Sequence, residues 1–109
     1  MAEPTLVQVF GTGTTQDATT ITILKVNLPR LTPSATNTAE SLLTGILLKA
    51  KDGLMRTTFD TNIDQSLYVE GGFAQFVFRG TNNDGYRVDQ LTVSLARPDD
   101  ASIIDPNNY

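Results

Sequence analysis

The chain has 109 residues and a formal net charge of −4, from eight basic and twelve acidic side chains. This length predicts one domain with a single hydrophobic core and little room for a deep pocket. The acidic balance provides no basic surface for nucleic acid or for anionic lipid, so neither is expected as a partner.

Two residue types that carry much of enzyme chemistry are missing. The sequence contains no cysteine and no histidine, which removes disulfides, thiolate ligands, cysteine nucleophiles and the commonest general base. We therefore expect a protein that is not an enzyme, with no catalytic residues and no cofactor. The N-terminus lacks the regions of a signal peptide, and no apolar stretch is long enough to span a membrane. Synthesis in the cytoplasm is the expectation.

The first third of the chain is rich in β-branched residues, and two strands are expected there. Residues 5–10 and 19–26 are the candidates, the second because its side chains are mostly Thr, Ile and Val. Glycines, threonines and an aspartate in residues 11–18 indicate a turn between them. Residues 27–38 contain two prolines and several small polar residues, which favours an exposed loop.

Residues 39–50 allow two interpretations. Their leucine and isoleucine spacing fits a helix, and Asn37 with Glu40 resembles a capping box. Alternatively, residues 46–50 and 54–59 form a hairpin across Lys51-Asp52-Gly53, since Asp-Gly between apolar runs is a strong hairpin signal. The hairpin interpretation is favoured, with Gly45 as a feature of the first strand.

The C-terminal half has the clearer strand pattern. A short strand is expected near residues 67–69, followed by a long hairpin of residues 73–79 and 86–96 around the turn 80–85. About seven short strands then follow from the whole chain, which predicts an all-β fold, an antiparallel β-sandwich or small barrel. One domain is expected over residues 1–109, with its core at about 5–97 and extended terminal arms at 1–4 and 98–109.

The aromatic residues gather in this half of the chain. Phe73, Phe76 and Phe78 lie near Tyr68 and Tyr86 in the sequence. Because Phe76 and Phe78 share one face of a strand, the pattern favours packing in the core over an exposed sugar-stacking or partner patch.

One acidic segment resembles part of a calcium-binding loop. Asp60, Asn62 and Asp64 have the alternate spacing with which oxygen ligands converge on a hard cation. The glycine and the bidentate glutamate of a complete EF-hand loop are not at their positions, so an EF-hand is excluded. These three residues remain the candidate metal ligands of a looser site.

The C-terminal arm carries apolar side chains that a free tail would leave in water. Ile103, Ile104 and Tyr109 follow a segment without helix or strand pattern. Such a segment can add to the sheet edge or groove of another subunit, so these residues are the predicted partner interface; fraying of a free terminus is the alternative.

A small, acidic, Thr/Asn/Gly-rich β domain without Cys or His and with extended ends resembles the head decoration, or cement, proteins of tailed bacteriophages. The resemblance covers the style of the whole chain and rests on no diagnostic motif. It implies a homo-oligomer, often a trimer, bound to the major capsid protein on the surface of a virion. A small carbohydrate-binding or calcium-assisted module is the alternative function, and a tail or baseplate component is a further one.

Overall fold

The computed structural model describes residues 2–99 and 103–109, and it contradicts the expected all-β sandwich. The described chain combines helices with three separate two-stranded sheets. None of its helices has the length and apolar character needed to cross a bilayer. The elements in chain order are α1 (Leu6–Phe10), β1 (Thr15–Gln16), β2 (Ile21–Thr22), a 3-10 helix (Lys25–Asn27), α2 (Ala39–Gly53), α3 (Arg56–Thr61), β3 (Leu67–Gly71), β4 (Gln75–Arg79), β5 (Asp84–Val88), β6 (Leu91–Leu95) and a final 3-10 helix (Pro106–Asn108).

The strand expected at residues 5–10 is instead the short helix α1. Thr5 and Gln8 form a capping box, in which the Thr5 hydroxyl accepts from the Gln8 N–H and the Gln8 side-chain oxygen accepts from the Thr5 N–H. These two bonds satisfy donors that the first turn of a helix leaves free, and they outweigh the β-branched content of the segment. Gly11, at φ 106°, ends the helix.

The prediction of a strand at residues 19–26 is also mostly wrong. Only Ile21–Thr22 pairs with a neighbouring strand, and the chain then turns into the 3-10 helix Lys25–Asn27. The cause lies before it, where the Asp17 carboxylate accepts the backbone N–H groups of Thr19 and Thr20, each at 2.8 Å. This tight turn leaves only a two-residue ladder between β1 and β2.

The hairpin favoured for residues 46–59 is wrong, and the helical alternative is correct. α2 begins after Thr38, whose hydroxyl accepts the Ser41 N–H at 3.1 Å, and continues through Asp52 and Gly53. Its two glycines have packing roles. A Cβ at Gly45 would lie 3.0 Å from the Leu28 Cβ, and one at Gly53 would lie 1.9 Å from the Gln8 carbonyl oxygen. The N-terminal segment therefore packs closely against α2 at both glycines.

The strands of the C-terminal half are confirmed, with a different pairing. β4 and β5 form the expected hairpin around residues 80–83, and β3 confirms the short strand near residues 67–69. The second strand of the expected hairpin is interrupted at Asp89 and Gln90, and its continuation, β6, pairs with β3. The four strands thus form one long two-stranded antiparallel structure, which we call the ribbon. β3 and β6 form the base of the ribbon, and β4 and β5 form its tip.

A bulge separates the two halves of the ribbon. Residues 72–74 on one strand lie opposite residues 89–90 on the other, so the register shifts by one between the two ladders. One extra residue in a strand reverses the side to which all later side chains point. Following the alternation along β5 and β6, this places Phe76 and Phe78 on the side of the ribbon that carries Val93.

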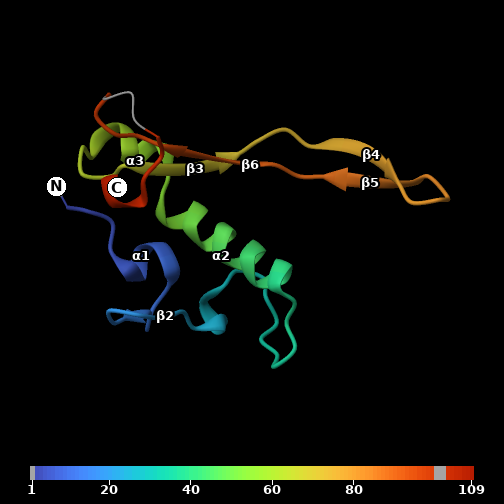
Figure 1. The fold of residues 1–109 in the computed structure, drawn as a ribbon, viewed down its shortest axis with the longest axis horizontal. Coiled ribbons are helices and arrows are strands. Elements are labelled where there is room, and N and C mark those ends of the chain that lie inside the picture. The colour runs from blue at the N-terminus through green and yellow to red at the C-terminus, as the bar shows by residue number, and fades with distance from the viewer. Residues whose placement is uncertain (1, 100–102) are drawn as a thin grey trace.

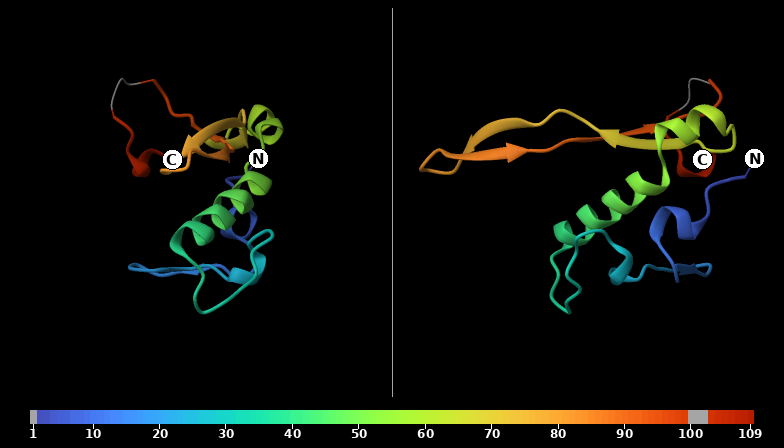
Figure 2. Two further views of the ribbon diagram at one scale, coloured as in Figure 1. Left: turned by 90° about the vertical axis from the view of Figure 1, so that its right-hand side faces the viewer. Right: turned by 180° about the vertical axis from the view of Figure 1, so that it is seen from behind.

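The molecule is extended and buries little. Its radius of gyration is 16.6 Å, against about 13 Å for a compact domain of this length. The buried hydrophobic residues in the described chain are Leu28, Leu54 and Val69, which lie where α2 meets the N-terminal segment and the ribbon base. Figure 1 and the right-hand view of Figure 2 show the β4–β5 half of the ribbon projecting beyond the helices.

Candidate interaction surface

One side of the ribbon tip is a patch of exposed phenylalanines. Phe76 and Phe78 lie on the same side of β4 with exposures of 76% and 75%. Phe78 lies opposite Gly85, which offers no side chain to cover it. Phe73, in the bulge, is 88% exposed. The expectation that these rings pack in the core is therefore wrong: they lie in solvent.

The opposite side of the ribbon tip carries apolar residues as well. Val77 pairs with Tyr86 across the ladder, and Val88 follows on the same side. The Arg79 guanidinium lies 4.9 Å from the centroid of the Tyr86 ring, a cation–π contact that covers part of it. A hairpin in water normally has one apolar and one polar side. This one carries exposed aromatic residues on both sides, next to Arg87 on the Phe76 side and next to Gln75, Arg79 and Asp84 on the Val77 side.

The base of the ribbon is anchored on α3. The Phe59 and Tyr68 rings lie 4.8 Å apart, and the Arg56 guanidinium lies 5.1 Å from the Tyr68 ring. Arg56 also approaches Glu70 at 3.7 Å. The Val69 N–H donates to the Leu54 carbonyl at 2.8 Å, which satisfies part of the outer edge of β3. The tip is therefore held by a fixed base.

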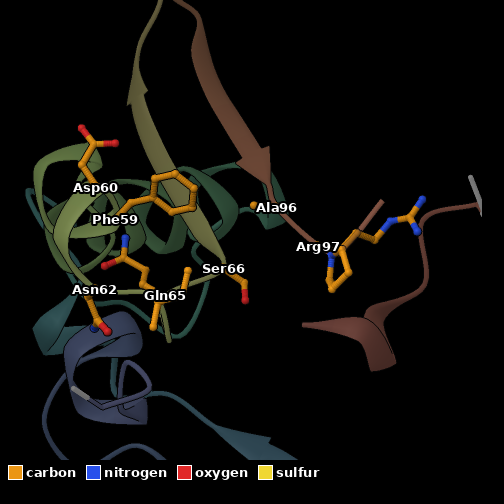
Figure 3. A pocket seen from close by; sticks show the side chains of 9 residues that line it. Phe59, Asp60, Asn62, Gln65, Ser66, Ala96 and Arg97 are labelled. Carbon is orange, nitrogen blue, oxygen red and sulfur yellow. The ribbon is translucent and has the colours of Figure 1, made fainter. Parts of the chain in front are cut away.

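A groove of about 610 Å³ lies where α3 meets the end of β6. Phe59, Ile63 and Pro98 contribute apolar walls to it. Figure 3 shows the carboxylate of Asp60 and the guanidinium of Arg97 pointing away from one another. The labelled side chains do not form the nucleophile and base pair that covalent catalysis needs.

The three candidate calcium ligands lie in different local structures. Asp60 lies in α3, while Asn62 follows the helix and Asp64 lies in the turn beyond it. The Asn62 amide nitrogen donates to the Ala2 carbonyl at 2.8 Å, and its side-chain oxygen accepts the Asp64 N–H at 3.1 Å. In the described residues no group of three or more acidic side chains could hold a metal ion. The spacing instead serves a turn that ties down the N-terminal segment.

The residues of the predicted C-terminal interface differ in exposure. Ile103 and Ile104 are 85% and 68% exposed, whereas Tyr109 is half-buried. The last 3-10 helix begins at Asp105, whose carboxylate accepts the Asn107 N–H at 2.9 Å. The two isoleucines are thus available to a partner, and their role as an interface stays a prediction.

An exposed patch was the less favoured alternative for these rings, although its signal is in the sequence. Apolar residues occupy both even and odd positions at the centre of β4, as Phe76, Val77 and Phe78 show, while the polar residues Gln75 and Arg79 lie at its ends. Two neighbouring exposed phenylalanines on a projecting hairpin form an apolar patch of the kind found at interaction sites. Comparison with protein-family models, curated proteins and solved structures finds no match, so the function is argued from these residues.

Proposed function

We propose that this chain is a non-enzymatic structural subunit of a larger assembly, namely a decoration subunit on the shell of a virion. The observation that carries the proposal is the amount of exposed surface. The chain has 8263 Å² of accessible surface, whereas a compact monomer of its size has about 5,900 Å². The excess of roughly 2,300 Å² is enough for more than one ordinary protein interface, at about 800 Å² per partner.

The ribbon tip supports the same conclusion. An isolated two-stranded hairpin is at best marginally stable in water, because it has no third strand or helix to cover its side chains. β4 and β5 make their extensive contacts only with each other among the described elements. A partner that covers the tip supplies the missing layer, so association and ordering of the tip are coupled.

The resemblance to head decoration proteins gives the assembly its specific form. The partner is then the major capsid protein, together with further copies of this chain in a trimer or another closed oligomer. The role is mechanical: a subunit that binds only the assembled shell shifts the equilibrium toward that shell by mass action. The exposed Ile103 and Ile104 provide a second apolar segment for such contacts.

The first experiment measures the solution mass of the purified chain by light scattering after size exclusion, with calcium and with a chelator. We expect a mass above that of one chain that does not respond to calcium. A double variant, Phe76→Ser with Phe78→Ser, should reduce the mass to one chain. The matched control, Thr81→Ser with Asn82→Ser, changes exposed polar residues of the same hairpin and should leave the mass unchanged.

The second experiment tests whether the chain is a component of virus particles. Particles with nuclease-protected DNA are purified on density gradients from the source organism's lysate and probed with an antibody to this chain. Co-sedimentation at many copies per particle supports a decoration subunit, and a few copies per particle indicate a tail or baseplate component. A calcium-dependent monomer that is absent from every particle fraction would refute the proposal.

A further inference from the structure

The β4 strand has a free edge beside its exposed rings. In the described residues β4 belongs to a two-stranded sheet with β5 only, so the backbone N–H and C=O groups along its other edge have no strand to pair with. Free edges of this kind are templates for a further strand. The base of the ribbon differs, because the outer edge of β3 already donates to the Leu54 carbonyl.

We infer that β4 pairs antiparallel with β4 of a second copy, about a two-fold axis through Val77. The result is a four-stranded sheet in the order β5, β4, β4 and β5. The inference deepens the proposed function by naming a contact between subunits, and it rests on that function in requiring that two copies meet.

The sequence of β4 selects one register for this pairing. In an antiparallel pair, residues directly opposite each other lie on the same side of the sheet. With Val77 opposite its own copy, Phe76 lies opposite Phe78 of the second copy, and the reverse, so that four rings form one cluster. A register shifted by two residues in either direction leaves one ring of each copy without an aromatic residue directly opposite it.

The charges of the strand agree with this register. Arg79 lies opposite Gln75 of the second copy, so the two arginines do not face each other. Like charges placed directly opposite are destabilising. An isologous contact must be complementary to itself, and β4 satisfies this requirement both in its rings and in its charge.

The two rings supply the apolar part of this contact. Phe76 and Phe78, with exposures of 76% and 75%, offer about 300 Å² per copy, since an aromatic side chain has roughly 150–250 Å² to bury. Two copies together offer about 600 Å², and backbone pairing with Val77 has to supply the rest of the roughly 1,000 Å² of a specific interface.

The other free edges suit a second copy less well. Pairing of β5 about Tyr86 would leave both β4 rings in solvent. β6 carries Val93 and Leu95, which are 42% and 41% exposed, so it offers less apolar surface than β4. Pairing through β6 is the competing arrangement that the experiment must separate.

The test uses single cysteines, because the chain has none of its own. Val77→Cys should cross-link to itself with a short bismaleimide or under mild oxidation. Its rate should exceed that of Val93→Cys by roughly tenfold or more, because thiols held opposite one another react at the effective concentration of a linked pair. Thr81→Cys, at the exposed turn, reports the background rate.

A second pair of cysteine variants tests the register. Gln75→Cys and Arg79→Cys should each cross-link poorly alone and efficiently when mixed, giving a heterodimer that a size tag on one variant identifies. Faster cross-linking at position 93 than at position 77, or background rates at both, would overturn the inference. Failure of these cross-links in a chain that still sediments with particles refutes this contact alone, whereas cross-linking by a chain found on no particle refutes the proposed function alone.

Discussion

Gln65 shows how a single polar side chain can organise a segment without regular structure. It is one of two buried polar residues in the described chain, at 4% exposure. Its amide nitrogen donates to the carbonyls of Met55 and Leu67 at 3.0 and 2.8 Å, and its oxygen accepts from the Thr58 hydroxyl at 2.9 Å. One side chain thereby joins α3 to the start of β3, and with it the helical anchor to the ribbon.

Replacing Gln65 by alanine should therefore lower the free energy of unfolding by about 1–3 kcal/mol, because buried carbonyls lose their donor and a cavity is left. Urea unfolding followed by circular dichroism measures the change. Gln16→Ala, at an exposed position of β1, is the control and should stay close to the parent chain. Equal effects of the two substitutions would contradict the assigned role.

The carboxyl group of Asp17 makes the stability of the folded chain depend on pH. Hydrogen bonds from the backbone N–H groups of Thr19 and Thr20, and then from their hydroxyls, lower the pKa of this carboxyl from 3.8 to about 2. A lowered pKa in the folded state means that the charged form contributes stability above pH 4, and that this contribution is lost as the pH falls toward 2.

An NMR titration of the Asp17 carboxyl carbon should thus give a midpoint near 2. Asp17→Asn should be less stable than the parent chain at neutral pH, and the difference should shrink between pH 4 and pH 2. A midpoint at the ordinary value, or a difference that does not change with pH, would show that the turn bonds are not formed in solution.

At the scale of elements, local signals predicted the strands well and the helices poorly. The C-terminal strands have alternating or apolar runs bounded by Gly and Asn, and those signals agree with the tertiary pairing. The Asp52-Gly53 signal failed because Gly53 is needed for a close approach of two helices rather than for a turn. Such an approach depends on Gln8, which is 45 positions away, and no local pattern records it.

Gly53→Ala tests this explanation directly. A Cβ at that position would lie 1.9 Å from the Gln8 carbonyl oxygen, which is backbone and cannot rotate away. We expect a loss of about 1–3 kcal/mol, with faster hydrogen exchange confined at first to α1. Gly71→Ala is the matched control, because its Cβ would meet only the end of the Lys51 side chain at 3.8 Å. Unchanged exchange in α1 would mean that the two helices are not in contact.

At the scale of the whole molecule, the expected sandwich and the expected core position of the aromatic rings were both wrong. The aromatic cluster was assigned to a core that a sandwich would have provided. Without that sandwich, Phe73, Phe76 and Phe78 are exposed, and the described core is limited to a few residues around Leu54. The error in the fold and the error in the surface therefore have one cause, the absence of a second sheet to cover the ribbon.

The proposed pairing of ribbon tips between copies predicts a stability that depends on the concentration of the chain. Association removes free subunits from the unfolding equilibrium, so each tenfold increase in concentration should raise the Tm by about 3–5 °C. The Phe76→Ser and Phe78→Ser double variant, which has lost the association, should melt at one temperature at all concentrations. Calorimetry over a hundredfold range measures both. A parent chain with a constant Tm would mean that the apolar ribbon tip is stable in water by itself, against the physical argument for its role as an interface.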